Sequence, residues 1–169
     1  GVTRAPVFKT AGIEHSRIVI RYVSENFAAL ASVCEKTSSH LKLKWADFSL
    51  TGKNLYIRFL FDTQDAMGMN MATIATSEAV KLIEKQTKAK CISLAGNFDI
   101  DKKPAWLNFL FGRGKKVWAE ATIPRSVCQR VLKTIPEKIT DLVYRKVLVG
   151  SAMAGSMGFN AHYANIIAA

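Results

Sequence analysis

The chain has 169 residues, of which 49% are hydrophobic and 22% charged, so it holds enough apolar material for one packed domain, or for one small domain and part of another. Its net charge of +11 favours anionic partners such as phosphate-rich cofactors, anionic lipid or nucleic acid. The basic residues are scattered, and the densest groups, 113–116 and 145–146, are too short for a nucleic-acid-binding arm.

The cysteines and histidines show no pattern of a disulfide framework or a metal centre. Cys34, Cys91 and Cys128 are far apart, odd in number and free of CxxC spacing, and none of the three histidines has acidic or cysteine neighbours at ligand spacing. We therefore expect no metal and a reducing, cytoplasmic setting. The longest weakly polar stretch, 147–159, is shorter than the roughly 20 residues of a membrane helix, so no span is expected.

Both ends of the chain differ from usual termini. The sequence starts at Gly1 without a methionine and stops in the apolar run IIAA, whereas natural termini are usually polar and exposed. We therefore expect an internal fragment of a longer protein.

The first third of the chain predicts a strand, a helical region and a hairpin. Residues 6–10 form an extended run, and 13–36 are amphipathic at helical spacing, with an interruption near 24–26. Strands are expected at 41–50 and 54–61, joined by the turn sequence TGKN. The second of these strands has one apolar face, made of Leu55, Ile57, Phe59 and Phe61.

A long helix and a short strand complete this region. The helix is expected at about 65–86, and an extended segment follows at 91–94. The buried stripe of the helix consists of Ala72, Ala75, Ala79, Leu82 and Ile83. The order strand, helix, strand, strand, helix, strand predicts an α+β fold of ferredoxin-like (βαββαβ) type, with an antiparallel sheet that carries two helices on one face.

The character of the sequence changes after Gly96. A polar loop through residue 103 leads to a helix or turn at 104–111, the turn sequence GRGKK and a strand at 117–123. Two helices are expected next, at about 125–133 and 137–147, with Pro124 and Pro136 in their first turns. The Ala- and Gly-rich tail from residue 150 is expected to pack closely against neighbours.

The sequence DAMGMNM at 65–71 stands where a strand passes into a helix. Asp65 is expected to cap the helix, Gly68 allows close approach of a ligand, and the free N–H groups of the first turn suit an anion. The alternative is a capped core helix in which three alternating methionines fill gaps.

Two further segments carry candidate chemistry. The loop AGNFDIDKKP at 95–104 is either a solvated turn or a site where a lysine beside an aspartate stabilises an oxyanion, which suits hydride transfer to a thioester or carbonyl. In NAHYAN at 160–165, His162 lies near a helix start with Asn165 three residues on. A lone histidine is more often a capping or core residue than a ligand.

Together, DAMGMNM, GNFDIDKKP, GRGKKVWAEATIP and LVGSAMAGSMGFNAHYAN resemble the class I hydroxymethylglutaryl-CoA reductases, in the same order and along essentially the whole chain. Arg58 followed by Asp65, Met67, Gly68 and Asn70 fits that family's cofactor signature, and the second half looks closest to archaeal members. The resemblance implies reduction of hydroxymethylglutaryl-CoA to mevalonate and CoA by two NAD(P)H, at the head of isoprenoid synthesis.

The resemblance also implies a domain organisation. Residues 1–5 would end a large-domain segment, and 6–93 would be an NAD(P)H-binding small domain inserted in a mainly helical large domain. Residues 94–104 would form the catalytic-lysine loop, and 105–169 part of the large domain that binds the CoA substrate. The family forms homodimers or larger oligomers, with active sites at subunit interfaces.

The site residues that the resemblance implies fall into three groups. Lys102 is the catalytic lysine, with Asp101 beside it. Arg4, Asp101 and Lys103 hold the carboxylate end of the substrate, while Lys146, His162 and Asn165 match positions near CoA or the active-site network. The cofactor residues are Ser38, Ser39, His40, Asp65, Met67, Gly68, Asn70, Met71 and Asn97.

The expected coenzyme is NADPH rather than NADH. Ser39 stands where some class I members place an arginine toward the 2′-phosphate, but Lys42, Lys44 and His40 lie close in the sequence. No acidic residue occurs between Thr37 and Lys44 to accept a ribose hydroxyl or repel the phosphate.

The sequence departs from the family pattern at Gln64, in place of a glycine, at Ala95, in place of a serine, and at Val147, in place of an asparagine. The family's catalytic Glu would lie before Gly1, and its catalytic Asp and His beyond Ala169. The fragment alone is therefore expected to be inactive.

Two other interpretations stay open at this stage. A basic ferredoxin-like domain can bind RNA through exposed sheet aromatics, for which Tyr56 and Trp45 are candidates, although no RNP-like string occurs. A catalytically dead regulatory homologue is the other, because three catalytic positions lie outside the chain.

Overall fold

The computed structural model describes residues 1–100, 105–114 and 118–159. The chain divides into two compact units, the sheet unit, Gly1–Lys116, and the helical unit, Val117–Ala169. Each unit is described by itself. The domain limits implied by the resemblance stay a prediction.

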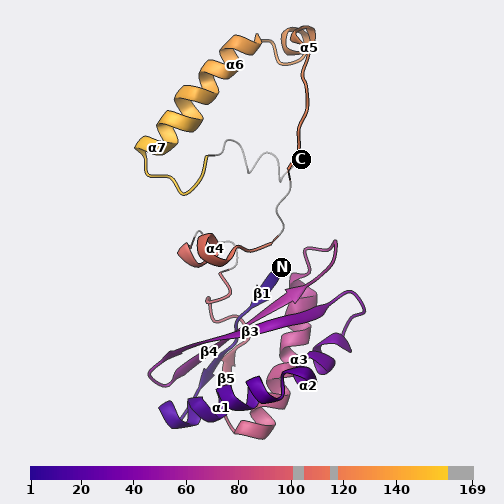
Figure 1. Ribbon diagram of the computed structural model, residues 1–169, viewed down its shortest axis with the longest axis vertical. Helices are drawn as coiled ribbons and strands as arrows, with labels where there is room; N and C mark the ends of the chain where they lie inside the picture. Colours follow the sequence, from indigo (N-terminus) through magenta and orange to yellow (C-terminus); the bar gives the residue numbers. More distant parts are fainter. Residues whose placement is uncertain (101–104, 115–117, 160–169) are drawn as a thin grey trace. The chain divides into compact units, whose positions relative to one another are not determined.

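The sheet unit is built on a five-stranded antiparallel sheet (Figure 1). β4 pairs with β3 along one side and with β1 and then β2 along the other, while β5 pairs with β2. β2 and β3 are therefore parallel with β4 between them, and β4 and β5 are parallel with β2 between them, which is a split βαβ arrangement. The predicted α+β class with an antiparallel sheet is confirmed. The strands are β1 (Val2–Arg4), β2 (Val7–Lys9), β3 (Lys42–Thr51), β4 (Asn54–Asp62) and β5 (Lys90–Ser93).

One face of the sheet carries the core. The predicted apolar face of β4 is fully buried, with Leu55, Ile57, Phe59 and Phe61 all at 0% exposure. Three helices cover it (Figure 1), namely α1 (Ile13–Glu25), α2 (Phe27–Glu35) and α3 (Met69–Thr87). Small side chains on the buried stripe of α3 let the helix approach the sheet closely, because alanine adds little thickness to the interface.

The predicted interruption of the first helical region is confirmed at Asn26, between α1 and α2. The side-chain amide of Asn26 donates a hydrogen bond to the carbonyl of Tyr22 at 2.9 Å, and such side-chain bonds to the backbone compete with helix continuation.

The start of α3 differs from the prediction, because the helix begins at Met69 and Asp65 does not cap it. The N-cap is Gly68, which makes no side-chain cap bond, and Asp65 is exposed in the turn before it. The turn has its own hydrogen bonds: the Asp62 carboxylate accepts from the Gln64 N–H at 3.0 Å, and the Thr63 hydroxyl donates to the Ala66 carbonyl at 2.8 Å. These local bonds hold 62–66 out of the helix.

A short helix, α4 (Trp106–Phe111), closes the described part of the sheet unit, two residues later than the predicted start. The helical unit contains α5 (Arg125–Arg130), α6 (Pro136–Leu142), the π-helical segment η1 (Val143–Gly150) and α7 (Ser151–Met153).

In the helical unit the two predicted helices are found with different boundaries, and the predicted strand is not found. Residues 118–123 form no strand, because a strand needs a partner for its backbone groups and no described segment pairs with them. α5 ends three residues early, whereas the next helix continues to Met153, since Gly150 itself has helical dihedral angles, φ −62 and ψ −41. Residues 152–159 are exposed, so the expected close packing of this tail is not found within the described chain. None of the helices in the ranges that the structure describes has the length and apolar content needed to cross a bilayer.

Candidate functional site

Gly68 is the N-cap of α3 and lies in close contact with Thr63. Its φ of 75° is left-handed, and a Cβ atom there would lie 2.3 Å from Thr63 Cγ2, so only glycine fits both the dihedral angle and the contact. The α3 helix then runs for 19 residues, and the N–H groups of its first turn have no partner within the helix. This arrangement suits a negatively charged group.

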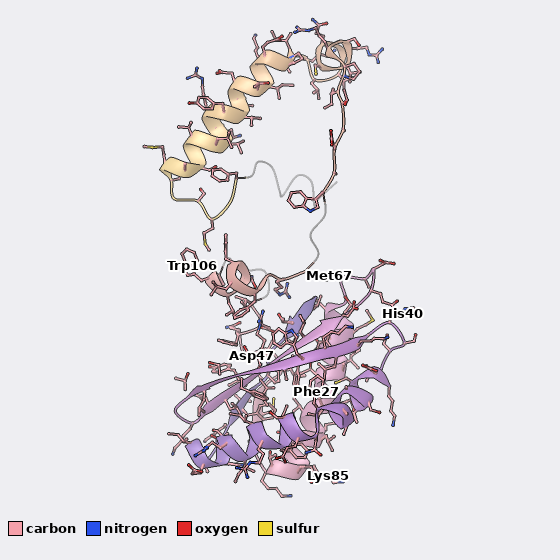
Figure 2. All side chains as sticks on the ribbon, viewed as in Figure 1. Phe27, His40, Asp47, Met67, Lys85 and Trp106 are labelled. Carbon is pink, nitrogen blue, oxygen red and sulfur yellow. The ribbon has the colours of Figure 1, made fainter. Side chains whose placement is uncertain are left out.

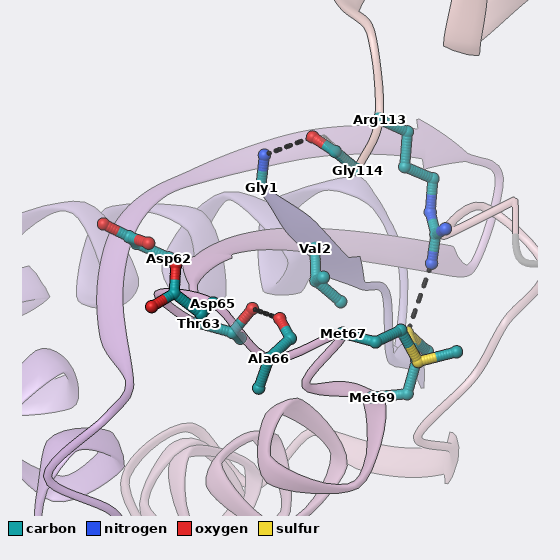
Figure 3. A pocket seen from close by; sticks show the side chains of 10 residues that line it. All are labelled: Gly1, Val2, Asp62, Thr63, Asp65, Ala66, Met67, Met69, Arg113 and Gly114. Atoms are coloured by element: carbon teal, nitrogen blue, oxygen red, sulfur yellow. Dashed lines mark hydrogen bonds between the residues drawn. The ribbon is translucent and has the colours of Figure 1, made fainter. Parts of the chain in front are cut away.

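Two adjoining cavities lie at this helix end, with Met67, Met69 and Arg113 in the wall of both. The first, shown in Figure 3, has a volume of about 390 Å³ and is lined by Gly1, Val2, Asp62, Thr63, Asp65, Ala66, Met67, Met69, Arg113 and Gly114. The second has a volume of about 520 Å³ and is lined by Arg4, Met67, Gly68, Met69, Asn70, Met71 and Arg113.

The structure brings most of the described candidate residues to these cavities. Met67, Gly68, Asn70 and Met71 line the second cavity together with Arg4, which the resemblance assigned to the substrate. Asp65 lines the first. The sequence alone separates Arg4 from the other residues, and only the pairing of β1 with β4 brings it to this helix end.

The methionines of DAMGMNM are not simply gap fillers in the core. Met69 and Met71 are partly buried against it, but the Met67 side chain is 69% exposed. Figure 2 places Met67 and His40 at one end of the sheet unit and Lys85, in the last turn of α3, at the other.

Ser38 contacts the first turn of α3, and His40 contacts the turn that precedes it. The Ser38 hydroxyl lies 3.3 Å from Met71 Sδ, and His40 Nδ1 lies 3.0 Å from Gln64 Oε1. Ser39 is exposed. Two distant stretches of sequence therefore meet at one helix end.

Arg4 forms a buried ion pair that the sequence analysis missed. Arg4 Nη1 lies 2.8 Å from Asp99 Oδ2, and the side chains are 9% and 2% exposed. The Thr3 hydroxyl also donates to the Asp99 carbonyl at 2.9 Å. The one available signal was the presence of two carboxylates in the loop at 95–104, of which the resemblance selected only Asp101.

The loop that contains Asn97 lies against the sheet. Gly96 donates its N–H to the Ala5 carbonyl at 2.8 Å, and a Cβ atom on Gly96 would lie only 3.0 Å from that same oxygen. Asn97 follows with a φ of 64° and is exposed. The described part of this loop is therefore attached by close backbone contact to Ala5, between β1 and β2, and is not an ordinary solvated turn.

Arg113 is the second residue that the sequence analysis missed, since GRGKK was read only as a turn. It lines both cavities, and its Nη2 atom lies 3.3 Å from Met69 Sδ (Figure 3). Together with Arg4 it makes the wall of the second cavity basic, which suits a phosphate or carboxylate.

Arg58 lies on the outer face of β4 and is only 1% exposed. Its guanidinium stacks on Trp45 at 5.5 Å and on Phe111 at 5.9 Å from the ring centroids. Burial lowers the pKa of Arg58 from its ordinary value, and the nearby Asp47 carboxylate opposes this effect.

Other candidate residues belong to the helical unit or lie outside the described residues. Lys146 is exposed in η1 of the helical unit. Asp101, Lys102, Lys103, His162 and Asn165 lie outside the described residues. Within 1–100, 105–114 and 118–159, no group of three His, Cys, Asp or Glu residues is arranged to hold a metal ion.

The sheet aromatics do not form the exposed platform that an RNA-binding sheet requires. Tyr56 is half-buried and packs against Phe98 with ring centroids 5.6 Å apart, and Trp45 is half-buried under the Arg58 guanidinium. Both rings are engaged within the chain.

Fold and cavities thus define an α+β domain whose long helix begins at a glycine N-cap beside two arginines, an arrangement that suits an anion. The family model described as hydroxymethylglutaryl-coenzyme A reductase matches residues 1–169, and the chain belongs to this family. The resemblance to the hydroxymethylglutaryl-CoA reductases is confirmed at the level of the family, and the RNA-binding alternative is not supported.

Individual relatives agree along the whole chain. The 3-hydroxy-3-methylglutaryl-coenzyme A reductase of Haloferax volcanii is 47% identical over 169 residues, which are 100% of this chain and 42% of that protein. The enzyme of Pyrococcus horikoshii is 47% identical over 170 residues, or 99% and 41%. That of Strongylocentrotus purpuratus is 43% identical over 173 residues, or 100% and 19%. The chain spans about two fifths of the length of the archaeal relatives.

Proposed function

We propose that this chain is part of a class I hydroxymethylglutaryl-CoA reductase that converts hydroxymethylglutaryl-CoA to mevalonate and CoA with two NADPH. The observation that carries the proposal is the family match over residues 1–169. The gathering of Arg4, Gly68, Asn70 and Met71 around one cavity supports it, because these residues come from the two groups assigned to substrate and cofactor.

The residues at the start of α3 fit a dinucleotide. A Cβ atom at position 68 would collide with Thr63, so the turn before α3 requires glycine, and the first-turn N–H groups provide donors for a phosphate. Asp65, Met67, Asn70, Met71 and Asn97 would hold the coenzyme together with Ser38, Ser39 and His40. When bound, the coenzyme supplies the hydride for each of two reductions.

The chain's own residues would stabilise the negative charge that develops in each reduction. Hydride attack on the thioester carbonyl forms an oxyanion, and the Lys102 ammonium would stabilise it more in the transition state than in the ground state. Asp101 would keep Lys102 charged and oriented. Arg4, Asp101 and Lys103 would hold the substrate carboxylate, and Lys146, His162 and Asn165 would act near CoA.

NADPH is the proposed coenzyme. The contact between Ser38 and Met71 joins residues 37–40 to the cofactor cavity, and 37–44 contains basic but no acidic residues. Such a segment tolerates a 2′-phosphate and lacks the carboxylate that selects the free ribose hydroxyl. A higher kcat/KM for NADH than for NADPH would contradict this assignment.

The experiment is an assay of the complete polypeptide that carries residues 1–169. We expect oxidation of NADPH that depends on hydroxymethylglutaryl-CoA, with mevalonate and free CoA as products, and a homodimer or larger oligomer by light scattering. The chain 1–169 alone serves as the matched control and should show no turnover. Binding of NADPH without any turnover by the complete protein would indicate a regulatory homologue instead.

A further inference from the structure

Arg113 is displayed on a tight glycine turn. Gly112 and Gly114 have φ angles of 68° and 77°, a left-handed conformation that other residues adopt at a cost. The Gly114 N–H donates to the Gly1 carbonyl at 2.8 Å, so the turn is attached to the backbone at the start of β1. The position of the Arg113 backbone is therefore set by the sheet.

The Arg113 side chain contacts the described part of the loop at 94–104, which is proposed to carry the catalytic lysine. Its Nε–H group points at two oxygens, the Asp99 carbonyl at 3.2 Å and the Thr3 hydroxyl at 3.3 Å. Asp99 is 2% exposed and Thr3 0%. Because Thr3 also donates to the Asp99 carbonyl at 2.9 Å, the partly buried Arg113 forms one hydrogen-bonded cluster with the buried Thr3 and Asp99.

The same guanidinium contacts the start of α3. Arg113 Nη2 lies 3.3 Å from the sulfur of Met69, the first residue of the helix (Figure 3). One side chain therefore contacts β1, the segment at 97–100 and the helix end where the coenzyme is proposed to bind. A planar guanidinium with donors pointing in fixed directions is suited to this task.

We propose that Arg113 is a positioning residue, which fixes the segment at 97–100 relative to the N-terminus of α3. This inference rests on the proposed function. Lys102 follows Asp99 by three residues, so the cluster sets where the lysine loop leaves the sheet. The hydride donor and the lysine must meet at one carbonyl, and a misplacement of about 1 Å is enough to slow such a reaction by roughly 100-fold.

The test uses Arg113→Met and Arg113→Lys in the complete protein. Methionine keeps the apolar stem but no donors, and we expect kcat to fall by about 10- to 100-fold, while KM for both substrates and the equilibrium affinity for NADPH change by less than about threefold. Lysine restores the charge but not the fixed fork of donors, so its kcat should stay close to that of Arg113→Met. Arg17→Met, which removes an exposed arginine of α1, is the matched control and should leave all constants unchanged.

Two further measurements separate positioning from other roles. Hydrogen exchange of the amides at 97–100 should be faster in Arg113→Met, whereas exchange in the β3–β4 hairpin should be unchanged. Thr3→Val removes the shared hydroxyl. In the double variant with Arg113→Met, kcat should fall by less than the product of the two single decreases, because both side chains act through the Asp99 carbonyl.

The possible outcomes are distinct. A raised KM that Arg113→Lys repairs would show that Arg113 binds a ligand directly and would overturn the proposal. A lowered Tm with unchanged kcat would show a purely structural role. If Arg113→Met does not fold, Thr3→Val decides, since a positioning role requires a loss of kcat there too. A wild-type protein without reductase activity would refute the proposed function instead, while the exchange experiment would still test the cluster.

Discussion

The guanidinium of Arg4 and the carboxylate of Asp99, which are 95 residues apart in the chain, form a buried ion pair with 2.8 Å between Nη1 and Oδ2. Arg4 therefore reaches the second cavity with its direction set by a carboxylate, while still forming part of the cavity wall. A buried charge that loses its partner is costly, because the remaining ion cannot regain water.

The first prediction follows from this pair. Asp99→Ala should lower the free energy of unfolding by about 3–5 kcal/mol, and Asp99→Asn, which keeps a hydrogen-bond acceptor, should lower it by less. Urea unfolding followed by circular dichroism measures both. Glu14→Ala removes the exposed partner of Arg17 and should cost less than about 0.5 kcal/mol. Equal losses for Asp99→Ala and Glu14→Ala would mean that the Arg4 pair is effectively solvated.

The second prediction concerns Gly68. Alanine there must adopt a φ of 75° and place its Cβ 2.3 Å from Thr63 Cγ2. Gly52 is a matched control, because its φ is 59° but nothing lies within 4 Å of its added Cβ. Gly52→Ala should cost about 1–2 kcal/mol from the backbone alone, and Gly68→Ala about 1–3 kcal/mol more from the clash. Urea unfolding measures the loss of stability in both variants. Similar losses would show that the turn at 63–68 shifts at little cost to accommodate the added Cβ atom.

The third prediction is a pH dependence that arises from Cys34. Burial raises the pKa of this thiol from 9.0 to about 12, and the Glu35 and Glu78 carboxylates add to the effect. Between these values the unfolded state releases a proton that the folded state keeps, so the Cys34 contribution to stability is complete below pH 9 and is lost as the pH rises toward about 12. Wild type should therefore lose stability more steeply than Cys34→Ala over this range. Parallel stability curves for the two proteins in urea would contradict the shift.

The fourth prediction assigns different roles to two lysines whose functions rest on the family resemblance. Lys102→Ala should lower kcat by about 100- to 1,000-fold, the usual loss when an oxyanion-stabilising donor is removed. Lys103→Ala should chiefly raise KM, because its pairing with the substrate carboxylate exists before and during the reaction. Steady-state kinetics of the complete protein separates the two, after confirming that both variants bind NADPH normally. If Lys103→Ala loses kcat while Lys102→Ala keeps it, the roles are reversed.

Much of the fold could be predicted because the sequence patterns that specify its strands, turns and helices are local. The alternation of apolar residues in β4, the turn sequence TGKN and the alanine stripe of α3 each depend on neighbours within a few positions. The start of α3 was misplaced, because a competing set of turn hydrogen bonds at 62–66 resembles a helix cap in sequence. The prediction of a strand at 117–123 was wrong because strand formation depends on a pairing partner, which a local pattern does not specify.

The sequence by itself determined the family, through motifs whose residue types and order are specific, and it determined the buried faces of β4 and α3. The tertiary structure alone decided which residues meet at the start of α3. Arg113 and Thr3 are 110 residues apart, and Ser38 and Met71 are 33 apart. Contacts of this kind depend on strand register and on the direction of each side chain from a packed backbone, and neither is encoded in the spacing of residues along the chain.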